Sequence, residues 1–503
     1  MQNPGQLIIA AECGIQIGTG HVMRCLALAQ SWRRFGGGVT ILLPEGSPGI
    51  EQRLHSEGIS LQTLPAGGFP EAAVNRVLDA SPQAAVLDGY GFSGREQSIL
   101  SSAGVAVLTV DDYGHATEYP VRWILNQNAG ARPEMYSHRS AGAHLLLGTA
   151  YALLRGEFSC WLGWKRSIVE KAGKILVTIG GSDPENLSAR ILESIALLRR
   201  PGLQVVLAVG SSNPHLQVLQ STVGRMDLSV RIVQSAVDMP ALMAWADVAV
   251  SGAGGTAYEL CYMGLPSLLF VIAENQRGVA EHLSELSAVV YAGEARKFNA
   301  RRFAEELGYL LDSQEQRRVL SDAARSLVDS LGADRVRAIL VGRELHLRPV
   351  RESDCQLLFA WANDPATRSA SFHSAPIPWQ DHRQWFSERL RDPQSVIYIG
   401  ETRTGEPVGE VRFHLNVERA TLSVVVDQKF RGAGWGRELI AFAIRSLART
   451  RPVRQVDAFV KAGNAASIGL FESTGFRRAG TAPVAGQPAL QFIWEGGGDV
   501  AAD

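Results

Sequence analysis

The chain has 503 residues, 46% hydrophobic and 20% charged, with 49 Lys and Arg against 50 Asp and Glu. This length predicts about three domains with buried cores, and the net charge of −1 argues against partners among nucleic acids or acidic membranes. Because the five cysteines are far apart and lack metal-ligand spacing, we expect reduced thiols and no metal site. The sequence has no leader-like N-terminal segment and no apolar run of ~18 residues, so we expect a cytoplasmic protein that acts on small molecules. Nothing in the composition indicates the oligomeric state.

A glycine loop, Gly18 to Arg24, follows an apolar run at 7–11 and precedes helically spaced apolar residues at 22–35. This pattern predicts a strand, a tight turn and the start of a helix. Gly18 and Gly20 allow the backbone to approach a ligand closely, and the N–H groups of the first helical turn favour an anion. His21 would then face the ligand, although capping of the helix is the simpler explanation for a lone histidine.

Short apolar runs alternate with helical patterns from residue 7 to about residue 160, which predicts a doubly wound parallel sheet. Further strands of this sheet are expected at 39–43, 84–87, 105–110, 124–125 and 145–147. Ligands of such sheets bind at the carboxyl ends of the strands. His21, Asp88 with Tyr90, and the cluster Asp111 to Tyr113 all fall there. These aspartates are site candidates by position only, and for Asp88 and Asp111 a role in loop capping or turn formation is at least as good an explanation.

A second alternating set begins near Lys174, with strands expected at 175–179, 205–209 and 230–233. The first of them runs into a glycine turn that includes Ser182, a weak signal for phosphate binding. A stronger signal is the glycine-rich turn from Ser251 to Thr256, which begins a helix. Its amides would bind a diphosphate, while Glu259, one turn later, would reach a ribose diol. Packing alone also explains such a turn.

The last third of the chain begins a new strand near Glu344, after two amphipathic patterns that fit the last helices of the second sheet domain. Strands are expected at 395–401, 407–414 and 420–426. The last strand leads into Arg431, Gly434 and Gly436, in the pattern R-x-x-G-x-G, and then into a helix. This junction offers amides and a positive dipole end to a pyrophosphate. The expected domains are therefore 1–165, 166–342 and 343–497.

Four segments together carry a specific resemblance over roughly residues 5–340: 18–24, "LLLGTAYALLRGEF" at 145–158, "GGSDPENL" at 180–187, and 238–276. They resemble the nucleotide-sugar hydrolases of pseudaminic acid biosynthesis, which release UDP from UDP-2,4-diacetamido-2,4,6-trideoxy-β-L-altrose and have the two-domain glycosyltransferase-B fold. The resemblance implies that His21 is catalytic. It also implies that the UDP-sugar is bound by Gly18, Gly20, Arg24, Ser182, Gly254, Gly255, Thr256, Glu259, Asn275 and Gln276.

The chain departs from this family at two places. Where the family has R-A-D after its first strand, this chain has Ala10, Ala11 and Glu12, and the segment after Asp111 also continues differently. The resemblance therefore indicates the reaction type more firmly than the sugar.

Residues 345–495 resemble the GNAT superfamily of N-acetyltransferases, because Asn464 and Ser467 add its N-x-x-S motif to the R-x-x-G-x-G loop. The resemblance implies acetyl-CoA as co-substrate, bound by Val426, Arg431, Gly432, Gly434, Trp435, Gly436, Asn464, Ser467 and Phe471. Many members place a tyrosine acid at the position of Phe471, so here the acid lies elsewhere or is dispensable. Glu410 is the candidate base and His414 a weaker one, with a solvated strand face as the alternative for both.

Together the two resemblances imply a fused enzyme with two consecutive reactions. It would acetylate the amine of a UDP-4-amino-4,6-dideoxy-N-acetyl-altrosamine with acetyl-CoA, and then hydrolyse the product to free sugar and UDP with inversion. One alternative is a glycosyltransferase-B glycosyltransferase fused to an acetyltransferase that acts on another amino sugar. Another is a non-catalytic sugar-binding module with an active acetyltransferase. The sequence leaves open the stereochemistry of the sugar and whether the intermediate passes directly between the sites.

Overall fold

The computed structural model describes residues 5–14, 18–46, 48–181, 183–210, 213–432 and 434–496. The chain divides into two compact units. Pro4–Phe158 and Lys165–Arg337 form the larger unit, whereas Ser159–Trp164 and the chain from Ala338 onward form the smaller unit. None of the helices among the described residues is long and apolar enough to span a membrane.

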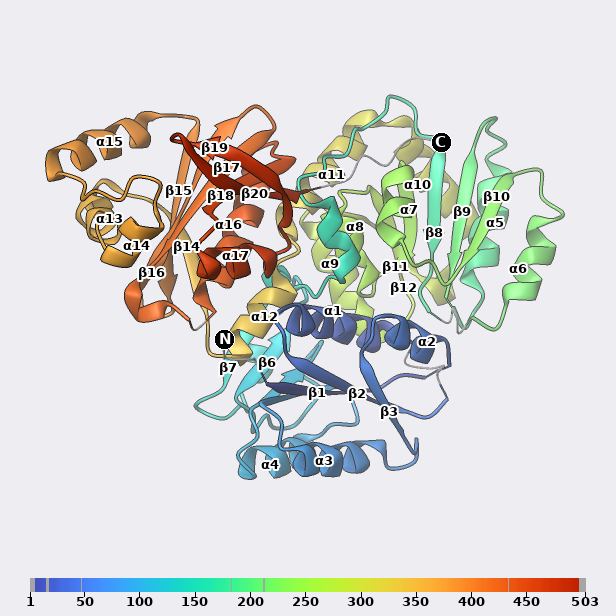
Figure 1. Cartoon of the computed structure of the whole chain (residues 1–503). Coiled ribbons are helices and arrows are strands. Elements are labelled where there is room, and N and C mark those ends of the chain that lie inside the picture. Colours follow the sequence, from blue (N-terminus) through green and yellow to red (C-terminus); the bar gives the residue numbers. More distant parts are fainter. Residues whose placement is uncertain are drawn as a thin grey trace. The chain divides into compact units, whose positions relative to one another are not determined.

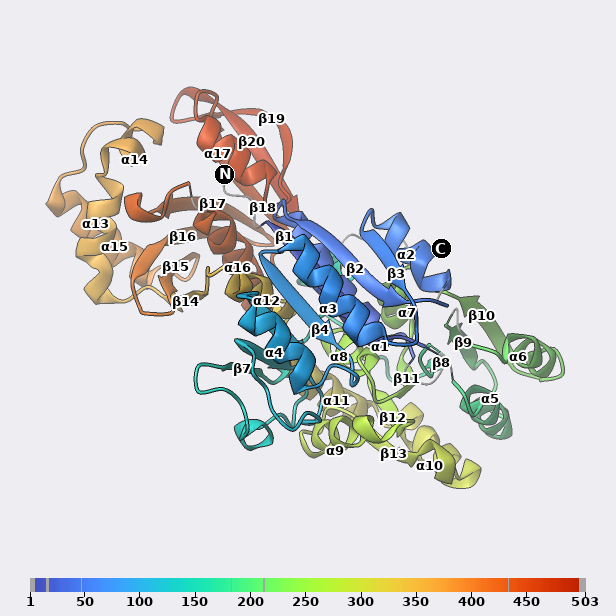
Figure 2. The ribbon, with the colours of Figure 1, turned by 90° about the horizontal axis from the view of Figure 1, so that it is seen from below.

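The first half of the larger unit is a seven-stranded parallel sheet with the order β3-β2-β1-β4-β5-β6-β7. Its strands are β1 (Gln6–Ala11), β2 (Gly38–Pro44), β3 (Ser60–Leu64), β4 (Ala84–Asp88), β5 (Val107–Val110), β6 (Trp123–Asn126) and β7 (His144–Leu147). Its helices are α1 (Gly20–Arg34), α2 (Pro48–Ser56), α3 (Phe69–Ala80) and α4 (Gly94–Ser102). Figure 1 shows α1 and α2 on one face of this sheet, and Figure 2, seen from below, shows α3 and α4 on the other. Helices on both faces explain why the consecutive residues Leu7, Ile8 and Ile9 are all buried.

The second half of the larger unit is a six-stranded parallel sheet with the order β10-β9-β8-β11-β12-β13. Its strands are β8 (Lys174–Thr178), β9 (Gln204–Val209), β10 (Ser229–Gln234), β11 (Val248–Gly252), β12 (Ser267–Val271) and β13 (Val290–Glu294). Its helices are α5 (Leu187–Leu197), α6 (Leu216–Val223), α7 (Met239–Trp245), α8 (Thr256–Tyr262), α9 (Arg277–Glu285), α10 (Ala300–Asp312) and α11 (Gln314–Leu327). Apolar side chains from the strands and from α5 and α10 fill its core.

Both parallel sheets have the Rossmann strand order, in which the order reverses between the first and fourth strands. The predicted pair of doubly wound domains is thus confirmed. The reversal lies between β1 and β4 in the first sheet and between β8 and β11 in the second. Ligands of open α/β sheets bind at such switch points, outside the carboxyl ends of the strands.

Helix α12 (Gly332–Leu340) packs on the first half of the larger unit, whereas the sequence predicts that residues up to 342 belong to the second. Ser31 of α1 donates a hydrogen bond to Asp334 and accepts one from Arg337. The Arg337 guanidinium also stacks 3.5 Å from the centre of the Phe35 ring. Because these polar groups are buried, they fix α12 against α1, and that partner cannot be identified from an amphipathic pattern alone.

The smaller unit is a seven-stranded sheet with the order β14-β15-β16-β17-β18-β20-β19, antiparallel except for the pair β17 and β18. Its strands are β14 (Leu345–Pro349), β15 (Ser395–Thr402), β16 (Pro407–Asn416), β17 (Arg419–Val426), β18 (Gln455–Lys461), β19 (Arg477–Val484) and β20 (Gln487–Glu495). Its helices are α13 (Cys355–Ala362), α14 (Pro365–Ala370), α15 (Trp379–Arg391), α16 (Trp435–Thr450) and α17 (Ala465–Glu472).

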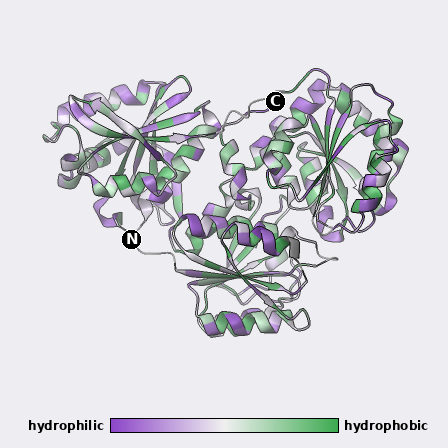
Figure 3. Cartoon of the chain, turned by 45° about the vertical axis from the view of Figure 1, so that its right-hand side comes forward, coloured by the Kyte–Doolittle hydropathy of each residue, from purple (hydrophilic) through white to green (hydrophobic). Residues whose placement is uncertain are grey.

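Two apolar clusters lie on opposite faces of this third sheet. One joins the sheet to α16 and α17 and includes Leu162, from the short segment Ser159–Trp164. The other joins the sheet to α13 and α15. The helices are amphipathic, which Figure 3 shows as green and purple residues on the same helix. No pattern in the sequence indicates that the segment around Leu162, expected in the first domain, packs into this core.

Candidate functional site

The loops after β1 and β4 meet at the switch point of the first sheet. His21 lies in the first turn of α1, and Asp88 is the last residue of β4. His21 Nδ1 lies 3.1 Å from Asp88 Oδ1, although the ring is not well aligned for a hydrogen bond. With Nδ1 toward the carboxylate, Nε2 is the ring nitrogen left for a water or a ligand.

The glycine loop before α1 is described only in part, because residues 15–17 lie outside the described residues. Gly18 has a φ of +78°, in the left-handed region that favours glycine, and Gly20 begins α1. On the second sheet, Gly181 follows β8, and a Cβ added there would lie 2.5 Å from Thr19 Oγ1. Gly181 therefore allows the turns after β1 and β8 to approach closely. Ser182, predicted to contact the UDP-sugar, lies outside the described residues.

Arg24, one turn after His21, bridges two buried carboxylates. Its Nε and Nη2 donate to Asp88 at 2.8 and 2.7 Å, and its Nη1 donates to Asp112 at 2.7 Å. Burial alone would raise the pKa of both carboxyls, but Arg24 holds each pKa below its usual value, with His21 adding to the effect. Both aspartates are therefore ionised at neutral pH. Arg24, predicted to bind the UDP-sugar, thus has a structural role that the sequence did not indicate.

Tyr90 connects this network to the second half of the larger unit. Its hydroxyl donates to Asp112 Oδ2 at 2.8 Å and accepts from Asn275 Nδ2 at 2.7 Å. Its ring stands edge-on to His21, with the ring centres 5.2 Å apart. Burial raises the pKa of Tyr90, and Asp112 raises it further, so the hydroxyl keeps its proton. Asn275, predicted from the second half, is thus joined to the histidine site through one tyrosine.

The glycine-rich turn lies at the switch point of the second sheet, between β11 and α8. Gly254 lies close to Gln276, whose Nε2 would be 3.5 Å from an added Cβ. Gln276 Oε1 accepts a hydrogen bond from the Ile272 backbone N–H at 3.1 Å, which holds the loop after β12 beside the turn. A Cβ added at Gly255 would meet nothing within 4 Å, so packing does not explain that glycine. The structure thus brings Gly254, Gly255, Thr256 and Gln276 together.

Glu259, predicted to hold the ribose, forms a buried ion pair across the two halves. Arg155 Nε and Nη2 donate to its Oε1 at 3.0 and 2.8 Å, and Arg155 Nη1 lies 3.0 Å from Glu157 Oε1. Burial raises the pKa of Glu259, and Arg155 opposes that shift. No described residue bonds Oε2, so one oxygen is left for a ribose hydroxyl. In the sequence, Arg155 stands only within the segment "LLLGTAYALLRGEF", and its ion pair with Glu259 was not predicted.

In the smaller unit, the parallel strands β17 and β18 separate part-way along their length. Their pairing runs from Arg419 with Gln455 to Leu422 with Ala458, and beyond that point the described residues are not paired. Residues 423–426 therefore present backbone groups to a wedge that widens toward the R-x-x-G-x-G loop. An extended ligand with amide groups can pair with such a free strand edge. The pantetheine arm of acetyl-CoA is such a ligand, so these residues fit the predicted co-substrate.

The R-x-x-G-x-G loop is held in place by its own arginine. Arg431 Nε donates to the Val426 carbonyl at 2.9 Å, and Nη2 donates to Asp364 at 2.7 Å. Gly432 and Gly434 have φ values of +77° and +88°, which a side chain would strain. The structure therefore gives Arg431 a bracing role, whereas the binding of a pyrophosphate by the loop amides stays a prediction. Ala433 lies outside the described residues.

Other residues predicted to contact acetyl-CoA have packing roles. A Cβ added at Gly436 would lie 3.2 Å from Leu470, so this glycine allows α16 to approach α17. Asn464 caps α17, because its Oδ1 accepts from the Ser467 N–H at 3.1 Å. Phe471 is buried against two other phenylalanines, and the Trp435 ring stands edge-on to Phe430. A contact of these residues with acetyl-CoA stays a prediction.

Glu410 and His414, the candidate bases, lie in different surroundings on β16. Glu410 is only 1% exposed, and its Oε2 has no hydrogen-bond partner among the described residues. Burial raises the pKa of Glu410, and Arg412, whose Nε lies 3.4 Å from Oε1, opposes the shift only in part. The alternative of a solvated strand face is therefore wrong for Glu410, whereas His414 is exposed.

Comparison with known families shows what each part resembles. Residues 344–477 match the acetyltransferase (GNAT) domain, and residues 174–322 match the glycosyltransferase family 28 C-terminal domain. The chain contains a GNAT acetyltransferase domain. With the two Rossmann-like domains, this confirms the predicted fold class, a glycosyltransferase-B-like pair followed by a GNAT domain.

Three relatives span different shares of the chain. An uncharacterized protein of Methanocaldococcus jannaschii is 20% identical over 94% of this chain and 97% of its own length. The spore coat polysaccharide biosynthesis protein SpsG of Bacillus subtilis is 25% identical over 66% of this chain and 96% of its own. The pseudaminic acid cytidylyltransferase and UDP-2,4-diacetamido-2,4,6-trideoxy-beta-L-altropyranose hydrolase of Helicobacter pylori is 24% identical over 53% of this chain and 44% of its own.

Proposed function

We propose that the larger unit hydrolyses a UDP-sugar and that the smaller unit first acetylates an amine of the same sugar. The observation that carries the proposal is the pairing of two switch points in one unit, with His21 and Asp88 at one and the Gly254–Gly255 turn at the other. The hydrolase activity for which the Helicobacter pylori relative is named supports this reaction, as does the role in spore coat polysaccharide biosynthesis for which the Bacillus subtilis relative is named. The sugar proposed is the diacetamido altrose named for the first of these.

In the proposed hydrolysis, His21 acts as general base. Nε2 takes a proton from a water whose oxygen attacks the anomeric carbon, and the bond from that carbon to the diphosphate breaks with its electron pair leaving on UDP. Asp88 holds the tautomer in which Nε2 is free to accept. Because UDP is a good leaving group, one base is enough and no second carboxylic acid is required. Attack opposite the leaving group inverts the anomeric centre.

The proposed binding of UDP uses the second switch point. The amides at the start of α8 would face the diphosphate, and Glu259 Oε2 would accept a hydrogen bond from a ribose hydroxyl. Arg155 keeps Glu259 in place by occupying its other oxygen. Asn275 would then lie between the nucleotide and His21, because it already reaches Tyr90.

In the proposed acetylation, acetyl-CoA supplies the acetyl group as a thioester. The loop braced by Arg431 would hold the pyrophosphate, and the free edge of β17 would pair with the pantetheine amides. Acetylation must come first, because hydrolysis removes the UDP group. A pocket shaped for a neutral acetamido group would reject the ammonium of the unacetylated sugar, since desolvating that charge is costly.

A second candidate is a glycosyltransferase that passes the sugar to an acceptor. This candidate is supported by the match of residues 174–322 to a glycosyltransferase domain. That domain alone does not distinguish transfer of the sugar from its hydrolysis. The two candidates differ in the need for an acceptor. A third possibility, a larger unit that binds the sugar nucleotide without turnover, predicts no UDP release under any condition.

The deciding experiment incubates the full chain with acetyl-CoA and the UDP-4-amino sugar and follows both products by NMR. We expect N-acetylation first and UDP release afterwards, with no acceptor added. Leaving out acetyl-CoA should suppress UDP release, whereas supplying the diacetamido sugar directly should restore it. UDP release that requires an added sugar or lipid would favour the transferase. Rapid release from the unacetylated sugar would refute the proposed order of reactions.

A further inference from the structure

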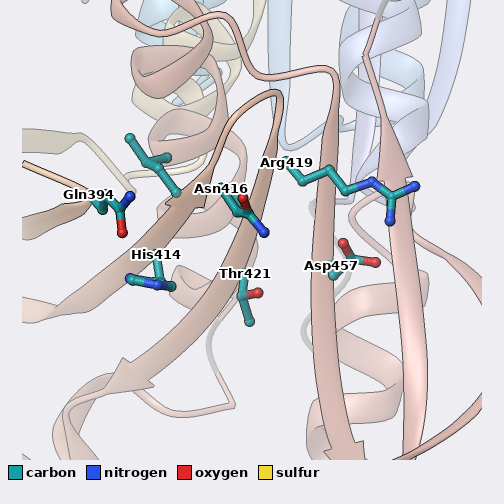
Figure 4. Close-up of a pocket in the computed structure, with 8 residues that line it drawn as sticks. Gln394, His414, Asn416, Arg419, Thr421 and Asp457 are labelled. Atoms are coloured by element: carbon teal, nitrogen blue, oxygen red, sulfur yellow. The ribbon is translucent and has the colours of Figure 1, made fainter.

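A polar pocket of about 460 Å³ lies at the end of the β16–β17 hairpin in the smaller unit. Figure 4 labels six of its side chains: Gln394, His414, Asn416, Arg419, Thr421 and Asp457. His414, Thr421 and Asp457 are direct neighbours across β16, β17 and β18, so they share one face of the sheet. Leu422 and Ala458, the next residues along, lie on the other face in the core with α16. The pocket therefore opens on the face away from α16.

Asp457 is the only carboxylate among the eight residues that line this pocket. No ion pair joins it to a described lysine or arginine, although Arg419 lines the same pocket. Asp457 is 7% exposed. Its Oδ1 accepts hydrogen bonds from Gln455 and Gln491, both at 2.9 Å, and its Oδ2 accepts a longer one from Gln455 at 3.2 Å. Both donors are neutral amides. By contrast, the buried carboxylates Asp88 and Glu259 are each paired with an arginine.

Two neutral amides hold Oδ1 of Asp457, and a positively charged ligand would add an ion pair to these hydrogen bonds. The pocket wall thus presents a held carboxylate with one oxygen, Oδ2, that is weakly engaged. Such a group binds a ligand ammonium well, because a charge-assisted hydrogen bond is stronger than a neutral one.

The pocket also lies next to the place where the acetyl group would end. The pair Thr421 and Asp457 is followed directly by Leu422 and Ala458, the last pair before β17 and β18 separate. A pantetheine arm that enters at the R-x-x-G-x-G loop and follows the free edge of β17 runs toward this closed end of the wedge. Glu410, in contrast, pairs with Val425 near the open end and lies beneath α13 and α15.

From these observations we infer that the pocket is the acceptor site of the acetyltransferase and that Asp457 binds the substrate ammonium and takes its proton. The inference rests on the proposed acetylation and deepens it. The substrate class is a primary amine on a polar, anionic carrier. Thr421, Gln394 and Asn416 offer hydrogen bonds to sugar hydroxyls and amides, and the exposed Arg419 offers a positive charge to a diphosphate.

The proposed step converts the substrate ammonium and acetyl-CoA into an acetamide and CoA thiol. One proton moves from nitrogen to Asp457 and then to water, which frees the nitrogen electron pair. That pair forms the new carbon–nitrogen bond with the acetyl carbon. The carbon–sulfur bond of the thioester breaks, and the electrons of that broken bond stay on the CoA sulfur. A second proton leaves the nitrogen and ends on that sulfur, so the products are the acetamide, CoA thiol and one proton in solution.

The test is Asp457→Asn in the full chain. An asparagine oxygen in the place of Oδ1 keeps both 2.9 Å hydrogen bonds, so this change should preserve the fold. We expect the kcat of acetylation to fall by about 10² to 10⁴ at pH 7, the usual loss on removing a general base. The KM for acetyl-CoA should stay the same. Raising the pH should reduce the deficit, because more of the substrate amine is then already neutral, and a purely structural defect would not respond in this way.

Two controls use the same preparation and a matched variant. UDP release from the preformed diacetamido sugar should be normal in Asp457→Asn, since that reaction belongs to the larger unit. Glu495→Gln removes one exposed charge on the neighbouring strand outside the pocket and should keep wild-type acetylation. Acetylation by Asp457→Asn within about threefold of wild type would overturn the inference and leave the proposed function standing. A wild-type chain that does not acetylate the amino sugar would refute the proposed function, and the inference with it.

Discussion

Replacing Asp88 by asparagine tests whether Asp88 sets the orientation and the tautomer of His21. Asp88 Oδ1 accepts from Arg24 and faces His21 Nδ1, while Oδ2 accepts from Arg24 and from the Cys25 thiol. An asparagine can place its NH₂ group on either side. Toward His21, it favours the tautomer whose Nε2 carries the proton and cannot take one from water, and it also faces the Nη2 donor of Arg24. Toward Arg24 Nε, it sets two donors against each other.

We expect Asp88→Asn to lower the kcat of UDP release by about 10² to 10⁴, as loss of the carboxylate partner of a catalytic histidine does elsewhere. Breaking a buried ion pair typically costs about 3–5 kcal/mol. The free energy of unfolding should fall by less than this, because Asp112 still neutralises Arg24. The assay measures UDP release at saturating diacetamido sugar, and urea unfolding measures stability. UDP affinity should change little, since the nucleotide turn is on the other sheet.

A double-mutant cycle with His21→Ala decides whether Asp88 acts through the histidine. If it does, adding Asp88→Asn to His21→Ala should cost almost nothing further, because the group that it orients is already gone. An equal loss of rate in both backgrounds would refute the orientation argument and point to a separate role for Asp88.

Three further predictions concern single residues. His21→Ala alone should lower UDP release by about 10² to 10⁴ and keep UDP affinity in calorimetry, and near-normal turnover would exclude His21 as the base. Glu259→Ala should weaken UDP binding by about five- to 150-fold, from the loss of a buried hydrogen bond worth about 1–3 kcal/mol, whereas unchanged affinity in calorimetry would exclude the ribose contact. Glu410→Gln should gain stability over wild type as pH rises. Burial raises the Glu410 pKa in the folded chain, so the stability that the protonated group contributes is fully present below its usual pKa and is lost as pH rises through the folded pKa. Urea unfolding between pH 4 and 8 measures this difference, and a constant gap between the two proteins would contradict it.

Most strands could be predicted from the sequence to within about two residues, because runs such as 84–87 and 205–209 are buried on both faces and leave a continuous apolar signal. Strand β3 was not predicted, since it lies at the sheet edge and only Leu64 of its five residues is buried. The hairpin of β19 and β20 was missed for a similar reason, because most of β19 is exposed. Strand β18 was not predicted either, although it lies inside its sheet and four of its seven residues are buried. Short-range periodicity therefore identifies most covered strands, but not all of them, and overlooks edges.

The sequence predicted those residues of the candidate site that lie within a single loop. Gly18, His21, Gly254 and Gly255 lie in glycine turns after buried strands, and the structure places those turns at the switch points. The groups that support them were not predictable, because Arg24 meets Asp88 across 64 residues and Arg155 meets Glu259 across 104. Such pairs depend on how the sheets pack, which no local pattern encodes.

The segment Ser159–Trp164 has a consequence for how the chain is made. It lies within the sequence of the larger unit, yet Leu162 packs in the core of the smaller unit. During synthesis at about 5–20 residues per second, this segment leaves the ribosome roughly 10–35 s before residue 338. An apolar leucine therefore waits for its partners while the second parallel sheet is still being translated. The smaller unit can be completed only after that delay, and a gene fragment that begins at residue 338 would encode it without this part of its core.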